Sequence, residues 1–331
     1  MKADNVSSMN FGGGTSETGS ENLLDGESRK SSELPRVSIG MPVYNGEKYI
    51  TRAIESILSQ TFEDFELIIC DNASTDSTRE ICDDYAKRDE RIRYFRNNKN
   101  IGAGPNFNKA VEYARGTYFK WAAHDDLCAP DFLRLCVENL DKDPDAVLAH
   151  PVAQIIDEDS APVMINEEDP KVGHLDPVVR FTELTRGHRC FQVFGLIRLS
   201  DLKATPMIGL FARGDALLLC WLALRGRFIK IDEVLFFPRS HETQSMSMLA
   251  NKKLNKKVDY VAYSEWFDPR LAKRMVFPWW RGSWELFKCV SLTPITLGER
   301  FRCYWHVVKW IFARRRALAS DVFRQFRRIS S

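Results

Sequence analysis

Carboxylate side chains follow apolar runs at several points in the first half of this 331-residue chain. Asp71 ends one such run, and Asp125 and Asp126 end another. Neighbouring carboxylates bind hard divalent cations such as Mg²⁺ or Mn²⁺, and a cation of this class can neutralise two linked phosphates. Asp71 has no helix of its own to cap, so its carboxylate is available to accept from a base N–H. For Asp76, Asp125 and Asp126, capping of a helix is the competing interpretation.

An alternation of strand and helix patterns positions these carboxylates. Strands are predicted at residues 37–41, 65–70, 92–95 and 117–123, and a helical pattern follows each of the first three. Looser patterns predict a strand at 146–151, helices near 177–186 and 215–224, and a strand at 228–237. This alternation predicts an α/β fold, with a mostly parallel, Rossmann-like sheet flanked by helices. In such a sheet the ligand site lies at the carboxyl ends of the strands.

The two ends of the chain differ in composition and charge, although the formal net charge is only +2. Residues 1–34 are rich in Ser, Gly, Glu and Asn, and we predict a disordered leader there. Residues 270–331 carry fourteen Lys or Arg against three acids, together with Trp279, Trp280, Trp284 and Trp305. Helices that mix Trp with Arg suit a bilayer surface, so peripheral membrane contact is predicted.

Other interpretations of this basic, aromatic tail remain open. Its aromatic residues could pack on the rest of the chain while its Arg residues face solvent, or the tail could form an oligomer contact. No nucleic-acid-binding motif accompanies it, so we expect no nucleic-acid partner. The eight cysteines lack a C-x-x-C pair, which favours a reduced, cytoplasmic chain without a zinc site or disulfide framework. No apolar run of about 18 residues is present, so any contact with a membrane is expected at its inner face, from the side.

Four short motifs follow one another along the chain: VSIGMPVYN at 37–45, DNASTD at 71–76, NIG at 100–102 and HDD at 124–126. In this order they resemble the inverting family 2 glycosyltransferases of GT-A fold, of the bacterial surface-polysaccharide type. The resemblance covers roughly residues 36–245. It implies transfer of a sugar from a nucleoside diphosphate sugar, with a UDP-sugar as the expected donor, to a hydroxyl of a glycan or lipid-linked acceptor. It also implies a divalent metal, Mn²⁺ or Mg²⁺.

The resemblance implies a role for individual residues. Asp215 would be the general base that removes the proton of the acceptor hydroxyl. Asp125 and His241 would hold the metal, with Asp126 as a further candidate. The turn after the first strand would pack on the base and Asp71 would read it, so the nucleotide-sugar-binding residues would be Pro42, Val43, Tyr44, Glu47, Asp71, Asn106, His124 and Arg239.

The sequence departs from the family pattern at two positions. The family's acidic motif commonly runs Asp-x-Asp-Asp, and Ala123 stands at its first position, where it cannot accept from a ribose hydroxyl. Asn106 stands where many relatives carry Arg. A catalytically weak or inactive nucleotide-sugar-binding module is therefore an alternative. A nucleotidyltransferase is less favoured, because residues 44–47 are not the Gly-rich loop with Arg or Lys that it would typically need.

The expected domain organisation follows from these patterns. The catalytic domain is predicted at 35–250, with a nucleotide-binding half at 35–126 and an acceptor half at 127–250. A helical, basic and aromatic C-terminal region is predicted at 251–331.

Overall fold

The computed structural model describes residues 34–168, 170–242, 250–251, 257–258, 260–271 and 274–329. Residues 34–331 form one compact unit. The predicted leader, apart from its last residue, lies outside the described residues. The predicted division of the chain after residue 250 stays a prediction.

The first half of the sheet is parallel, as predicted. Its strands are ordered β3-β2-β1-β4. Every position of β1 and β2 is buried, which is typical of a parallel strand covered on both faces. In the register of this pair, Val43 lies opposite Asp71, so both strands end at the same edge. The strands are β1 (Val37–Val43), β2 (Phe65–Asp71), β3 (Ile92–Arg96) and β4 (Tyr118–Trp121).

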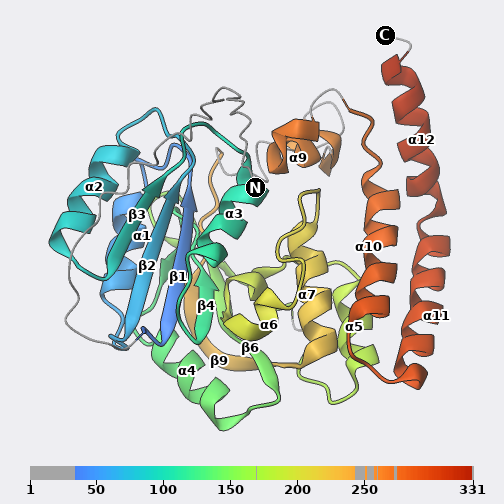
Figure 1. The fold of residues 1–331 in the computed structure, drawn as a ribbon, viewed down its shortest axis with the longest axis horizontal. Coiled ribbons are helices and arrows are strands. Elements are labelled where there is room, and N and C mark those ends of the chain that lie inside the picture. Colours follow the sequence, from blue (N-terminus) through green and yellow to red (C-terminus); the bar gives the residue numbers. More distant parts are fainter. Residues whose placement is uncertain are drawn as a thin grey trace, which may run out of the picture. The chain divides into compact units, whose positions relative to one another are not determined.

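Helices connect and cover these strands (Figure 1). They are α1 (Ile50–Leu58), α2 (Thr78–Arg88) and α3 (Ala103–Glu112), whereas α4 (Phe132–Lys142) packs on the second half of the sheet. In α1 the buried positions Ile50, Ala53, Ile54 and Ile57 follow the spacing of one helical face. The helix α3 packs on β1 and β2.

The second half of the sheet is mixed. Its order continues from β4 as β8-β6-β9-β5, with β7 beside β6. Only β6 and β9 pair in parallel, and the remaining pairs are antiparallel. The predicted α/β fold with a helix-flanked sheet is confirmed, and the antiparallel strands add to it. The strands are β5 (Leu127–Cys128), β6 (Ala146–Ile156), β7 (Pro162–Ile165), β8 (Leu196–Arg198) and β9 (Arg227–Phe237).

One helix of this half is buried on all sides. It is α7 (Gly214–Arg225), in which every residue from Ala216 to Leu224 is buried. A helix that is apolar all round needs cover on every face. That cover includes α5 (Pro177–Leu184), η1 (Phe191–Phe194), α6 (Leu199–Lys203) and the C-terminal helix α10.

The C-terminal region is helical, as predicted. α10 (Pro278–Leu292) packs on α7, and α11 (Leu297–Ala313) packs on α5 (Figure 1). A capping box between Thr296 and Glu299 starts α11. No helix in the described part of the chain has the length and apolar character that crossing a bilayer requires. The remaining elements are β10 (Ala250–Asn251), β11 (Lys257–Val258), α9 (Tyr260–Phe267), η3 (Pro269–Leu271) and α12 (Arg315–Ile329).

Candidate functional site

Hydrogen bonds join the loop after β1 to the loop after β2. The backbone N–H of Asn45 donates to Ser74 Oγ (3.0 Å), and the N–H of Thr75 donates to Asn45 Oδ1 (2.8 Å). The N–H of Gly46 donates to Thr78 Oγ1 (2.8 Å). Asn45 has a φ of 53°, a left-handed conformation that Asn tolerates better than most residues. The sequence therefore builds both loops as one unit at the carboxyl edge of the sheet.

Two carboxylates of these loops serve that connection. The N–H of Glu47 donates to Asp76 Oδ2 (3.0 Å), and the N–H of Ser77 donates to Glu47 Oε2 (2.9 Å). Asp76 also accepts from the N–H of Thr78, at the start of α2 (3.1 Å). This agrees with the interpretation that Asp76 satisfies the helix start. The side chain of Glu47 is oriented by the same network, and its predicted nucleotide contact stays a prediction.

Asp71 is fully buried at the end of β2. Its Oδ1 accepts from the N–H of Ser74 (2.8 Å), and its Oδ2 accepts from Tyr94 Oη (2.7 Å) and Arg96 Nε (3.0 Å). Burial, together with the hydrogen bond to Asp71, raises the pKa of Tyr94 above its ordinary value. Asp71 is thus held by three donors at the start of the second of the two hydrogen-bonded loops, residues 44–49 and 72–77, which we call the interlaced loops. Base recognition by Asp71 remains a prediction.

The predicted base-packing turn exposes one aromatic side chain. Pro42 and Val43 are buried inside β1, whereas Tyr44 is 45% exposed. Asn106 is buried below the loops, where its Nδ2 donates to the carbonyl of Cys70 (2.8 Å) and its Oδ1 accepts from Asn97 (2.9 Å). Tyr44 therefore offers an open aromatic face, and Asn106 supports the strand end from beneath.

The structure brings together the two metal-binding candidates that lie 116 residues apart in sequence. Asp125 follows β4 and His241 follows β9, and Asp125 Oδ2 lies 2.9 Å from His241 Nε2. The third candidate, Asp126, accepts from the backbone N–H of Arg239 (2.8 Å). Among the described residues, no group of three or more His, Cys, Asp or Glu side chains is arranged around a common metal position.

Asp125 and Asp126 have opposite electrostatic environments. Desolvation would raise the pKa of Asp125, but the neighbouring His124 and the hydrogen bond with His241 outweigh it and hold that pKa below its usual range. Desolvation and the charge of Asp125 together raise the pKa of Asp126 well above its usual range. Asp125 is therefore the carboxylate that keeps its negative charge, as a metal ligand must.

Arg239 makes hydrogen bonds around the cluster formed by Asp125, Asp126 and His241. Its buried guanidinium donates from Nε to the carbonyl of Asp125 (2.8 Å) and from Nη1 to the carbonyl of Asp157 (2.8 Å) and to Ser160 Oγ (3.0 Å). The guanidinium also lies over the ring of Tyr49, 4.8 Å from its centroid. Its Nη2 is buried and makes no hydrogen bond within the described part of the chain. The Nη2 of Arg239 is therefore left as a hydrogen-bond donor for an anion.

His124 connects the cluster to the interlaced loops. A Cβ at Gly46 would lie 2.7 Å from Cδ2 of His124, so the ring packs directly on that glycine. The first loop thus contacts the Asp125 cluster through this ring. The predicted contact of His124 with the nucleotide stays a prediction.

Asp215 lies in the first turn of α7, and a single residue, Gly226, separates the end of this helix from β9. Asp215 Oδ1 accepts from the N–H of Ala216 (2.8 Å), and its Oδ2 makes no hydrogen bond with the described residues. One carboxylate oxygen is therefore available to a substrate proton.

A histidine that the sequence did not single out lies near Asp215. The Nδ1 of His188 accepts from the N–H of Cys190 (3.1 Å), so its neutral ring carries the proton on Nε2. This Nε2 is buried, and it has no hydrogen-bond partner in the described ranges. Burial lowers the pKa of His188, and the charge of Asp215 opposes that effect. A lone His in a loop carries no spacing signal, so only the structure reveals it.

Known proteins resemble the chain in sequence and in fold. Residues 38–198 match the model of glycosyl transferase family 2. The chain is 41% identical to chondroitin synthase of Escherichia coli over 117 residues, which are 35% of this chain and 17% of that protein. It is 34% identical to the putative glycosyltransferase EpsH of Bacillus subtilis strain 168 over 125 residues, 38% of this chain and 36% of that protein. The chain thus aligns with less than half of either relative.

A solved structure agrees with the fold. The mannosyltransferase PcManGT from Pyrobaculum calidifontis, in complex with GDP-Man and Mn²⁺, superposes with a TM-score of 0.50 at 15% identity. The superposition covers 88% of this chain and 85% of that one. At this identity the likeness concerns the fold alone. The family match identifies residues 38–198 of this chain as a family 2 glycosyltransferase domain, and the superposition agrees with its GT-A fold.

Proposed function

We propose that the chain transfers a sugar, with inversion, from a nucleoside diphosphate sugar to a hydroxyl of a glycan or lipid-linked acceptor. A UDP-sugar is the expected donor, and surface polysaccharide is the expected product. The observation that carries this proposal is the contact of Asp125 with His241 at 2.9 Å, at the edge of the sheet that also holds the interlaced loops. A charged carboxylate and an imidazole this close together would supply two ligands to a metal ion that also binds the diphosphate of the donor.

The donor set fits a divalent cation that is completed by the substrate. A carboxylate oxygen and an imidazole nitrogen are both ligands that Mn²⁺ accepts, and Mg²⁺ favours the oxygen. Asp125 and His241 would hold the ion, and phosphate oxygens of the donor would supply further ligands. When bound, such an ion neutralises charge on the departing diphosphate. Arg239 orients Asp125 through a hydrogen bond to its carbonyl, and its Nη2 would donate to an anion.

Asp215 would act on the acceptor. Its unoccupied Oδ2 would take the proton of the acceptor hydroxyl while the hydroxyl oxygen forms a bond to the anomeric carbon. The bond from that carbon to the diphosphate breaks on the opposite face, so the configuration inverts. One carboxylate is sufficient for this step, which agrees with Asp215 being the single acid assigned to the acceptor side.

Release of nucleoside diphosphate tests the transferase proposal. Purified full-length chain would be incubated with a panel of UDP- and GDP-sugars, with Mn²⁺, Mg²⁺ or EDTA, and with or without a lipid extract. We expect release from at least one donor, faster with the extract. Binding of a donor by calorimetry without release from any donor would favour the nucleotide-sugar-binding module, which the Ala123 departure keeps as the alternative.

The metal assignment has its own variant. His241→Ala removes one proposed ligand, so the Mn²⁺ concentration for half-maximal release should rise at least tenfold. The matched control is His174→Ala, an exposed histidine before α5, which should leave that concentration unchanged. An unchanged Mn²⁺ requirement in His241→Ala would remove this residue from the metal site.

The C-terminal helices support a location at the cytoplasmic face of a membrane. Their outer faces expose large apolar side chains at helical spacing, while Trp279 and Trp310 pack inward. Cations lie over three of the exposed rings: Lys288 over Trp284 at 5.9 Å, Lys309 over Trp305 at 5.1 Å and Arg315 over Phe312 at 4.9 Å. Aromatic rings with cations beside them match the headgroup region of an anionic bilayer. The exposed apolar residues of α10 and α11 are Trp280, Trp284, Leu292, Leu297, Phe301, Trp305, Val308 and Phe312.

Vesicle sedimentation tests this location. Deletion of residues 270–331 would remove buried core residues of α10, so surface substitutions are the better choice. The full chain should sediment with phosphatidylglycerol vesicles, and Phe301→Ser with Trp305→Ser should reduce the bound fraction at least fivefold. The control pair Val163→Ser with Met164→Ser changes exposed apolar residues of β7 and should bind normally. Equal sedimentation of both pairs would contradict membrane contact through α11.

A further inference from the structure

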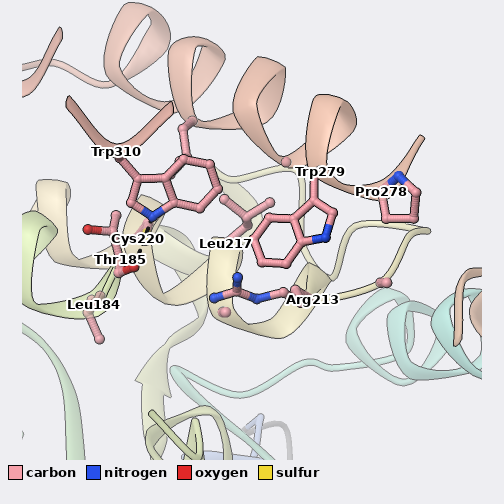
Figure 2. A pocket seen from close by; sticks show the side chains of 12 residues that line it. Leu184, Thr185, Arg213, Leu217, Cys220, Pro278, Trp279 and Trp310 are labelled. Carbon is pink, nitrogen blue, oxygen red and sulfur yellow. Dashed lines mark hydrogen bonds between the residues drawn. The ribbon is translucent and has the colours of Figure 1, made fainter. Parts of the chain in front are cut away.

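A narrow apolar pocket lies between α5, α7, α10 and α11 (Figure 2). Leu217 and Leu286 line it from α7 and α10, and the rings of Trp279 and Trp310 lie 6.1 Å apart at its wall. Its cavity of about 30 Å³ has room for roughly two groups of the size of water or a methylene. A sugar ring is too large for this cavity, whereas about two methylene groups of an alkyl chain fit.

A cation without a polar partner stands at this pocket. Arg213 lines it and lies over Trp279, with 5.7 Å from guanidinium carbon to ring centroid (Figure 2). Throughout the described ranges, its guanidinium makes no hydrogen bond or ion pair. Arg314 nearby differs, since it lies over Trp310 at 4.2 Å and donates to the carbonyl of Thr185. The donors of Arg213 are therefore free for a ligand, and phosphate is the anion that a guanidinium matches well.

A glycine inside α10 keeps space open at the same place. Gly282 lines the pocket, and a Cβ added there would meet no atom of the described residues within 4 Å. Glycine in a helix interior reduces helix stability relative to alanine. Packing around Gly282 does not require the missing side chain, so the space beside it is available to a ligand.

The pocket adjoins the proposed base. Arg213 and Ala216 both line it, and Asp215 lies between them in sequence. The exposed rings of Trp280 and Trp284 belong to the helix that forms one of its walls. An acceptor held here would therefore reach both Asp215 and the aromatic outer surface.

We propose that this pocket binds the anchor of the acceptor, a phosphate attached to an apolar chain. Arg213 takes the phosphate, and the first carbons of the chain enter between α7 and α10. This assignment rests on the proposed transferase function, and it adds the chemical class of the acceptor: a glycan that carries the accepting hydroxyl and is attached to an alkyl or prenyl phosphate or diphosphate. The cation and the apolar cavity are complementary to the two parts of such a molecule.

Binding of octyl phosphate to the full chain tests the pocket. Titrations by calorimetry would compare octyl phosphate with inorganic phosphate and with 1-octanol. We expect octyl phosphate to bind at least tenfold more tightly than either. Equal affinity for octyl phosphate and 1-octanol would overturn the role of Arg213, and equal affinity for octyl phosphate and inorganic phosphate would overturn the role of the cavity.

Two variants locate the binding. Gly282→Leu fills the open space and favours the helix, so octyl phosphate affinity should fall at least tenfold without a lower melting temperature. Its control is Gly298→Leu, also a helix glycine with open space around it but outside the pocket, which should bind normally. Arg213→Asn keeps a residue that tolerates the φ of 69° at this position, and it should lower octyl phosphate affinity to that of 1-octanol.

The outcomes separate this proposal from the transferase proposal. If Gly282→Leu and Arg213→Asn both bind octyl phosphate normally, the pocket assignment is wrong even when nucleoside diphosphate release is measured. If both lose binding while the wild-type chain releases nothing from any donor, the pocket stands as a binding site and the transferase proposal fails.

Discussion

The replacement Asp215→Asn separates chemistry from folding at the proposed base. The asparagine carbonyl can still accept from the N–H of Ala216, so the local hydrogen bond survives. What is lost for stability is one negative charge in the first turn of α7, which is worth about 0.3 to 1 kcal/mol. Loss of a general base costs about 10²- to 10⁴-fold in rate, or roughly 3 to 5 kcal/mol in the activation barrier. The kinetic effect should therefore be several times larger than the change in stability.

The assay for Asp215→Asn needs three measurements: release of nucleoside diphosphate, affinity for the nucleotide, and the melting temperature. We expect release to fall at least a hundredfold, while the other two quantities change little. The control is Asp201→Asn, which removes an acid from the first turn of α6 and an ion pair with Arg225 at 3.0 Å. This control should lose stability without losing turnover. Release by Asp215→Asn at more than a third of the wild-type rate would refute its role as the base.

Two further predictions concern the support of the site. Buried Glu66 accepts from Arg93 (2.7 Å) and Arg115 (2.9 Å), and with Ser38 these outweigh the effect of burial and lower its pKa. The stabilisation by Glu66 should be complete above the unfolded pKa of about 4 and should be lost as the pH falls through the lower folded pKa. Glu66→Gln should therefore cost about 2 kcal/mol in urea unfolding at pH 7, and less as the pH is lowered below 4. Gly46→Ala would place a Cβ 2.7 Å from a ring carbon of His124. We therefore expect about 1 to 3 kcal/mol of destabilisation, and weaker nucleotide binding by calorimetry. Wild-type stability together with wild-type affinity would show that the interlaced loops adapt freely to the added methyl group.

The parallel half of the sheet was predictable because strands that are buried on both faces appear in the sequence as continuous apolar runs. The strands β1 and β2 read as apolar runs, and the buried face of α1 recurs at helical spacing. The strands β5 and β8 have two and three residues, too few to show a period, so their antiparallel pairing was not predictable. Their positions follow from tertiary packing alone.

The site was predictable as a set of residues and not as an arrangement. Motif order identified Asp125 and His241, but no sequence pattern states that residues on different strand ends approach to 2.9 Å. That His188 Nε2 and the Arg213 guanidinium make no hydrogen bond with the described residues likewise depends on what surrounds them. The uniform apolar character of α7 does predict that other elements cover it, and two of those elements, α5 and α10, also line the apolar pocket.

The interlaced loops after β1 and β2 have a calorimetric consequence. Side chains and backbone of each loop already hold the other in place, so few torsions remain for a nucleotide to freeze. Association with such a surface loses little chain entropy and buries little additional protein surface through refolding. Nucleotide binding should therefore show a heat-capacity change set by the ligand's own contact area, and its association rate should not be limited by a preceding rearrangement of these loops.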